Sequence, residues 1–236
     1  MSRLRLWYGA VLFLAVLGVL MVVGGTDRAA AIGVCENPNC PQSIGILDGA
    51  ARGVQASIET ANPALRDCGS YPWCFSFVRT TVQDTSGGGN KFGEVGWIKG
   101  GTCGVTGPKK VITYKGSGIW SRICLGSLVV GSTHSYRIDR ADPPWQTIWD
   151  FYIDGVVQDA RPLDTSDATR VFCGGEVSTS ANAMGVSGCL WNAVRPSWAS
   201  YGSFYYNNHS SVDVSPPYQL VDLASPPYSW QVYGNN

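Results

Sequence analysis

Two glutamates in strand-like segments are the residues of this sequence best suited to chemistry. Glu94 lies within Phe92-Gly93-Glu94-Val95-Gly96-Trp97, and Glu176 lies within Cys173-Gly174-Gly175-Glu176-Val177. Two carboxyl groups that converge on one water can divide the work of hydrolysis, one as general base and the other holding the oxyanion. Glutamates that close would share a proton, so such activity would peak at acid pH. The alternative is that both are ordinary solvent-facing strand residues.

The glycines beside these glutamates bear on whether a ligand could reach them. Side chains alternate across a strand, so Glu94 shares a face with Gly96, whereas Trp97 points the other way. Gly96 would leave room beside Glu94, and Gly174-Gly175 would leave room before Glu176. The pattern therefore predicts one sheet face that carries both carboxyl groups next to open space.

The sequence lacks the motifs of most other common catalytic and metal-binding sites. The sequence has no G-x-S-x-G elbow, P-loop, H-E-x-x-H pair or EF-hand loop. With only His134 and His209, a Ser-His-Asp triad is possible but unsupported, and His134 in its alternating strand is better explained as a surface or structural residue. No C-x-x-C pair exists, so we expect no zinc site, and we expect no other metal and no cofactor.

The N-terminus predicts export. Arg3 and Arg5 precede an uncharged run over 6–26, and Ala29-Ala30-Ala31 offers a cleavage site of small residues. These features indicate a signal peptide, with mature protein from about Ile32. The alternative is a retained membrane anchor, because residues 6–23 approach the length that spans a bilayer. In both cases we expect the domain to be extracellular or on the cell surface.

The cysteines agree with export. Their even number, all after the leader, predicts a disulfide framework in an exported chain. Sequence alone does not fix the connectivity, but short loops close most easily, which favours pairing of neighbours. The expected pairs are Cys35–Cys40, Cys68–Cys74, Cys103–Cys124 and Cys173–Cys189.

Composition predicts short strands joined by tight turns. Only 14% of residues are charged, whereas Gly (29), Trp (9) and Tyr (11) are plentiful. Basic and acidic residues balance at 17 each, so nothing attracts nucleic acid.

Val54, Ile58 and Leu65 recur at helical spacings and make 44–66 the one helix candidate. Asp154-Gly155 predicts a hairpin turn. The expected strands span 74–82, 92–98, 110–115, 119–125, 127–138, 147–153, 170–173, 176–180 and 201–206.

Two consecutive segments carry a resemblance to a known fold. Residues 134–139, HSYRID, and 149–155, WDFYIDG, resemble the adjacent H-x-Y-x-I/V and W-x-F-Y-I/V-D-G strands of concanavalin-like β-sandwiches. The resemblance covers about 127–157 and implies an all-β, antiparallel, concanavalin-like (jelly-roll) sandwich. That fold hosts lectins, glycoside hydrolases, lyases and peptidases. Its laminarinase-like hydrolases carry an E-x-D-x-E strand, which is absent here, so we do not expect their activity.

The two glutamate segments resemble those of glutamic peptidases and of their secreted bacterial relatives of unknown function. One strand of that group carries Gln or Glu as in Q-x-G-W, and another carries Glu as in A-E-W or G-E-V. The resemblance implies that Glu94 and Glu176 form the catalytic pair, and we take Trp97 and Tyr114 as candidate binding residues. The W-x-E-W element of the group is missing, and residues 111–115 stand in its place, a departure that concerns activity more than fold.

An aromatic stretch supports a third hypothesis. Residues 198–208 read WASYGSFYYNN, and exposed rings beside asparagines are typical of sugar-binding faces. The alternative, which the pattern favours, is that Phe204 and Tyr206 at alternate positions fill the interior of the sandwich.

Together these observations predict a leader or anchor over 1–31, an N-terminal extension with a short helix over 32–66, and a β-sandwich over 67–236. We expect a glutamic-peptidase-like hydrolase scaffold, active or decayed, with a polypeptide or glycan as ligand. The alternative is a non-catalytic surface or carbohydrate-binding module. We expect no contact with a membrane except through an uncleaved leader.

Overall fold

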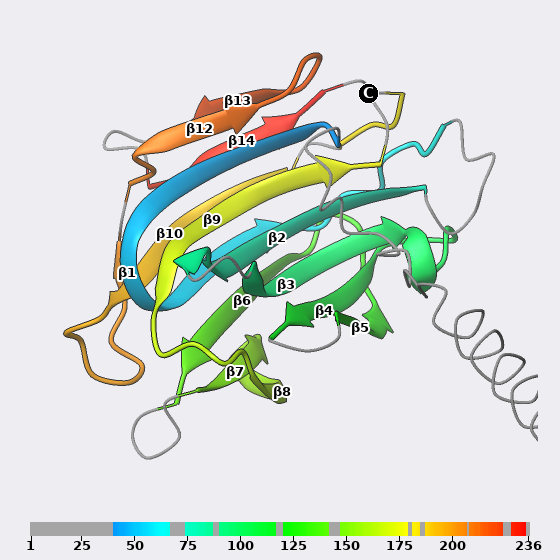
Figure 1. The fold of residues 1–236 in the computed structure, drawn as a ribbon. Helices are drawn as coiled ribbons and strands as arrows, with labels where there is room; N and C mark the ends of the chain where they lie inside the picture. Colours follow the sequence, from blue (N-terminus) through cyan, green and yellow to red (C-terminus); the bar gives the residue numbers. More distant parts are fainter. Residues whose placement is uncertain are drawn as a thin grey trace, which may run out of the picture. The chain divides into compact units, whose positions relative to one another are not determined.

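The computed structural model describes residues 40–66, 74–86, 90–116, 120–141, 147–178, 181–184, 187–206, 208–223 and 228–234. The expected leader, Cys35 and Cys68 lie outside these ranges. Within them no helix is long and apolar enough to cross a membrane. Their regular structure is antiparallel strands and one short 3-10 turn, η2 (Gly101–Cys103), which confirms the all-β prediction (Figure 1). The strands are β1 (Gln42–Glu59), β2 (Phe75–Asp84), β3 (Lys91–Gly100), β4 (Lys109–Lys115), β5 (Ser121–Ser127), β6 (Thr133–Arg140), β7 (Ile148–Ile153), β8 (Val156–Pro162), β9 (Ala168–Val177), β10 (Ser187–Pro196), β11 (Tyr205–Tyr206), β12 (Ser211–Val214), β13 (Gln219–Asp222) and β14 (Trp230–Tyr233).

The long strand β1 belongs to both layers of the fold (Figure 1). Its residues 42–48 pair with β9, whereas residues 53–59 pair with β6, and the register with β9 breaks between Asp48 and Ala51. One layer, here called sheet 1, has the order β12-β1-β9-β2-β3-β4-β5. The other, sheet 2, has the order β13-β14-β10-β1-β6-β7-β8, and β11 also pairs with β10. The result is the predicted antiparallel β-sandwich.

The core lies between the two sheets and is rich in large rings. Side chains alternate along each strand, so every second residue enters this core and the others reach the outer faces. Burial of apolar surface stabilises the fold by about 25 cal/mol per Å². Fully buried rings in the core include Trp97, Tyr136, Trp149, Phe151 and Trp230. Because the inner faces are filled in this way, a ligand can reach only the outer faces and edges.

The helix expected over 44–66 is wrong, because residues 42–59 form β1. Val54 and Ile58 are four residues apart, a spacing that fits one helical turn and equally fits alternate positions of a strand. In the structure Val54, Ala56 and Ile58 are all fully buried, which is the period of two. β1 is an inner strand of both sheets, so residues 42–59 belong to the sandwich.

Two of the expected disulfides are confirmed within the described residues. Cys173 of β9 bonds Cys189 of β10 with a Cα–Cα distance of 6.1 Å, so this bridge joins sheet 1 to sheet 2 through the core. Cys103 of η2 bonds Cys124 of β5 with a Cα–Cα distance of 5.4 Å. Cys40 and Cys74 are also disulfide-bonded. Their expected partners lie outside the described residues.

The two described bridges should differ in their resistance to reduction. Cys173 and Cys189 are fully buried, whereas Cys124 is exposed on β5. Because a reductant must reach a sulfur, mild dithiothreitol treatment of folded protein should open Cys103–Cys124 first and leave Cys173–Cys189 closed. Differential alkylation and peptide mapping measures the order. Earlier opening of Cys173–Cys189 would contradict the buried cross-sheet bridge.

Candidate functional site

An arginine that the sequence did not single out lies between the two candidate glutamates. Arg79 is on β2, the strand between β3, which carries Glu94, and β9, which carries Glu176. Arg79 Nε lies 3.0 Å from Glu94 Oε1, and Arg79 Nη2 lies 2.5 Å from Glu176 Oε2. The three residues are 2–3% exposed. One guanidinium thus bridges both carboxylates, and we call this group the Glu-Arg-Glu triad.

Two glycines make room for this triad. Arg79 is directly opposite Gly96 in β3 and Gly174 in β9. A Cβ on Gly96 would lie 2.1 Å from the Val78 carbonyl oxygen and 2.6 Å from Arg79 Cα. A Cβ on Gly174 would lie 2.2 Å from a backbone oxygen of β1. The space that the sequence predicted beside the glutamates exists, but the arginine and close strand packing take it up.

The triad forms part of the wall of a pocket on the outer face of sheet 1. The pocket has a volume of about 190 Å³ and combines amide, charged and apolar side chains. Its polar rim includes a hydrogen bond from Gln83 Nε2 to Asn90 Oδ1 at 2.6 Å and another from Gln42 Nε2 to Asp213 Oδ2 at 2.5 Å. Besides the triad, the pocket is lined by Gln42, Ile44, Ile46, Thr81, Gln83, Asn90, Phe92, Arg170, Phe172 and Asp213.

Burial and charge shift the pKa values of the triad in defined directions. Burial raises the pKa of Glu94, and Glu176 raises it further, which outweighs the opposing effect of Arg79. Burial alone would lower the pKa of Arg79, but Glu176 and Glu94 raise it, so this guanidinium stays charged. Burial lowers the pKa of Arg122 of β5 to about 10, although the negative charges of Glu94 and Glu176 act in the opposite direction. Glu94 therefore takes up its proton at a higher pH than an ordinary glutamate does.

Two buried atoms of the triad, Glu94 Oε2 and Arg79 Nη1, have no hydrogen-bond partner among the described residues. A buried oxygen without a partner costs about 1–3 kcal/mol, a cost that protonation or a bound ligand can relieve. Arg79 Nη1 could therefore donate a hydrogen bond to a ligand, and Glu94 could do so once it is protonated.

Trp97 and Tyr114, the candidate binding residues, do not line this pocket. Trp97 is fully buried between the sheets, and its Nε1 donates a hydrogen bond to the Glu59 carbonyl at 2.9 Å. Tyr114 packs against the same core, with its ring centroid 6.5 Å from that of Phe151. Side chains alternate along a strand, and Glu94 of β3 lies opposite Thr113 of β4. Trp97 is three positions after Glu94 and Tyr114 is one position after Thr113, so both point to the other side of the sheet, toward the core.

His134 forms a Ser-His-Asp arrangement that is structural. Its Nε2 lies 2.9 Å from Ser132 Oγ, and its Nδ1 lies 2.7 Å from Asp154 Oδ2. Ser132 Oγ, however, donates its proton to the Val129 carbonyl at 2.5 Å. The backbone N–H of Ser132 also bonds the Val129 carbonyl, so it is not free to hold an oxyanion. The trio fastens the turn before β6 to the turn after β7.

Comparison with known proteins shows the fold. No family model and no curated protein sequence matches the chain. Among solved structures, scytalido-glutamic peptidase with a transition state analog inhibitor is similar, with a TM-score of 0.55, 8% identity, and coverage of 84% of this chain and 99% of that one. SCP-B, a member of the eqolisin family of peptidases, in complex with the tripeptide Ala-Ile-His, gives a TM-score of 0.51 and 9% identity at the same coverage. The chain therefore has the concanavalin-like β-sandwich fold that these glutamic peptidases share.

Removal of the central charge should destabilise the protein. In Arg79→Met two buried carboxylates lose their counter-charge, which should lower the free energy of unfolding at pH 7 by about 3–5 kcal/mol. The variant Arg79→Met with Glu94→Gln and Glu176→Gln removes all three charges and should recover most of that loss. Urea unfolding measures both. A loss below about 1 kcal/mol in Arg79→Met would contradict the buried triad.

Glu94 should also give stability a defined pH dependence. Its pKa is raised in the folded protein, so the folded state binds the proton more tightly than the unfolded state does. The stability that Glu94 contributes is thus complete below its unfolded pKa and is lost as pH rises through the folded pKa. We expect Glu94→Gln to gain stability relative to the parent protein between pH 4 and pH 7. Equal pH profiles of unfolding for the two proteins would contradict this direction.

Proposed function

We propose that this chain is an exported polypeptide-binding protein, built on a hydrolase-like β-sandwich, that does not cleave its ligand at neutral pH. The observation that carries this proposal is the position of Arg79 between Glu94 and Glu176. Disulfide bonds in the described residues favour an oxidising compartment outside the cytoplasm.

The triad argues against hydrolysis at neutral pH. A general base must accept a proton from water, so one of its oxygens must be free to contact that water. Glu176 Oε2 is held by Arg79 Nη2 at 2.5 Å, so the atom that would activate water already accepts a strong hydrogen bond. Water activation would require this contact to open inside a buried site.

The rest of the pocket suits an extended peptide. Peptide ligands carry alternating amide groups and side chains, which match the mixture of Gln42, Gln83 and Asn90 with Ile44 and Phe92 in the lining. The similar structures named above hold a transition state analog or a tripeptide. Those ligands and the shared fold support a polypeptide over other ligands for this pocket.

A second function, an acid-acting glutamic hydrolase, is favoured by the raised pKa of Glu94. Once protonated, Glu94 carries a neutral carboxylic acid that resembles the amide of glutamine in shape and can donate a hydrogen bond to a scissile carbonyl. Glu176 would then be the base, with Arg79 supplying charge for the oxyanion. This function demands that activity rise as pH falls.

Binding and cleavage of unfolded casein at pH 3–7 separate the two functions. We expect fluorescence anisotropy to show saturable binding of labelled, denatured casein, and mass spectrometry to show intact casein at pH 7. Substitution of Gln83 and Asn90 together by Ala removes two rim amides and should weaken binding about tenfold. The matched control Tyr206→Ala changes an exposed side chain of β11 in sheet 2 and should leave casein binding unchanged.

The outcomes that overturn the proposal are concrete. No binding at any pH would remove the polypeptide ligand. Cleavage at acid pH that disappears in Glu176→Gln would establish the hydrolase instead. Cleavage at pH 7 would show that the Arg79 contacts open readily in solution.

A further inference from the structure

A second groove lies on the outer face of sheet 2, and nothing in the proposed function uses it. It has a volume of about 500 Å³ and is lined by Gln55 and Ser57 of β1, Ala193 of β10, Phe204, and Tyr206 of β11. Gln55 is opposite Ala193 on one side and opposite Arg137 of β6 on the other. The floor is therefore one amide, one hydroxyl and one methyl group, and Phe204 and Tyr206 complete the lining.

Exposed aromatic side chains are concentrated on the segment that follows β10, and among them Tyr206 lines the groove. Within the part of the chain that the structure describes, the aromatic residues classed as exposed are Trp198 at 73%, Tyr206 at 68%, Tyr205 at 49% and Tyr201 at 38%. The ring centroids of Trp198 and Tyr205 lie 5.2 Å apart. The expectation that Tyr206 fills the core is thus wrong, because Tyr206 lies opposite Ala193 in the pairing of β11 with β10 and its side chain is exposed. Such a concentration of rings in water marks a binding surface.

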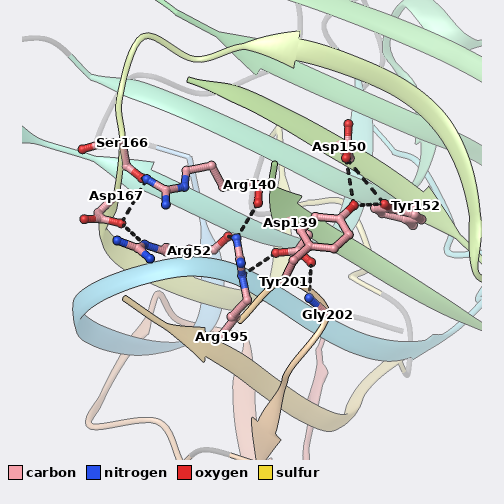
Figure 2. Close-up of polar contacts among 10 residues, drawn as sticks. All are labelled: Arg52, Asp139, Arg140, Asp150, Tyr152, Ser166, Asp167, Arg195, Tyr201 and Gly202. Atoms are coloured by element: carbon pink, nitrogen blue, oxygen red, sulfur yellow. Dashed lines mark hydrogen bonds and ion pairs between the residues drawn. The ribbon is translucent and has the colours of Figure 1, made fainter. Parts of the chain in front are cut away.

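The loop that presents these rings is held by buried polar contacts (Figure 2). Arg195 and Asp139 form an ion pair at 2.6 Å in which both side chains are fully buried. The Gly202 N–H donates to Asp139 Oδ2 at 3.2 Å, and the Tyr201 hydroxyl donates to Asp150 Oδ2 at 2.9 Å. The Tyr201 ring also covers the Arg195 guanidinium at 5.4 Å.

These contacts give the loop a fixed position relative to sheet 2. Loss of one partner of a buried ion pair costs about 3–5 kcal/mol, so Asp139 and Arg195 resist separation. A loop tied down at Tyr201 and Gly202 presents Trp198, Phe204 and Tyr206 without first being ordered. A ligand then meets a preformed surface, which lowers the entropic cost of binding.

We propose that this groove binds a neutral oligosaccharide, with pyranose rings stacked on Tyr206 and the neighbouring aromatic side chains. The C–H faces of a pyranose are apolar and pack on aromatic rings, while its hydroxyls need amide and hydroxyl partners. Gln55 and Ser57 supply those partners on the floor. Among the described residues the lining itself carries no charge, and the cation that contacts it is Arg137, whose guanidinium lies 5.8 Å from the centroid of the Phe204 ring.

The composition of the groove favours a sugar over a peptide or a second copy of the chain. A peptide that bound by its backbone would need a strand edge, and the floor strands β1 and β10 are both paired on each side. An apolar protein partner would offer no hydrogen bond to the Gln55 side-chain oxygen or to the Ser57 hydroxyl on the floor, which costs free energy on binding. A polyhydroxylated ring satisfies the floor and the aromatic side chains together.

The test uses soluble hexaoses with the protein as exported. Cellohexaose, chitohexaose and maltohexaose are titrated while tryptophan fluorescence and calorimetry are recorded. We expect at least one to bind saturably, and Tyr206→Ala and Gln55→Ala each to weaken it about tenfold. Tyr206 is 68% exposed, so its removal should leave the melting temperature unchanged. The matched control Glu94→Gln alters the other face and should bind the sugar as the parent protein does.

Three results would overturn the proposal. None of the three hexaoses binds, or binding survives both Tyr206→Ala and Gln55→Ala. Alternatively, analytical ultracentrifugation shows a dimer that Tyr206→Ala dissolves, which would assign the rings to a second copy of the chain. Because Gln83 and Asn90 line only the pocket of sheet 1, failure here leaves the polypeptide proposal intact.

Discussion

The contact of one buried guanidinium with two buried carboxylates is the constraint on which the functional face of this protein depends. Glu94 and Glu176 come from strands that do not touch each other, and β2 brings them together through Arg79. Two like charges this deep in a protein would repel and be neutralised without a cation between them. The arginine therefore fixes the protonation of the site and the spacing of three strands. Gly96 and Gly174 follow from the same constraint, because larger residues would collide with the neighbouring backbone.

The triad also shows why the fold alone does not determine the chemistry of the site. A β-sandwich can place two carboxyl groups on one face by strand register alone, and the similar peptidase structures share that architecture at 8–9% identity. Whether such a pair can activate water depends on what lies between its members. In this chain a cation lies there, so the three charged groups together carry one net negative charge in place of two. Fold and paired glutamates are consequently insufficient to assign hydrolysis.

The sequence predicted local features well and long-range ones poorly. The Asp154-Gly155 turn and the Cys173–Cys189 and Cys103–Cys124 bridges depend on near neighbours, and all are present. The role of Arg79 depends on pairing between β2 and β9, strands some ninety residues apart, which no local pattern reveals. A signal did exist, since Arg79 interrupts an otherwise uncharged run over 74–82.

Predictions from the sequence were wrong at two places, a strand boundary at a pair of glycines and the orientation of Tyr206. Gly174-Gly175 suggested a break, because glycine weakens a strand, yet β9 continues through both residues. Gly174 is required there by the close approach of the Ser43 carbonyl oxygen, which would lie 2.2 Å from a Cβ at this position. Alternation likewise placed Tyr206 on a definite side of its strand. It could not say which side a neighbouring sheet covers.

Each of the two sheets contains a group of buried charged side chains, and the two groups differ in their surroundings. On sheet 1 the ion cluster lies in the lining of a pocket, where a ligand can reach Glu94 and change its protonation. On sheet 2 the pair of Asp139 and Arg195 is fully covered by the loop that follows β10, so it holds that loop and takes no part in binding. Burial thus decides which charges can respond to a ligand and which only shape the surface around it. Among the described residues, Glu94 is the triad carboxylate that keeps a buried oxygen without a hydrogen-bond partner.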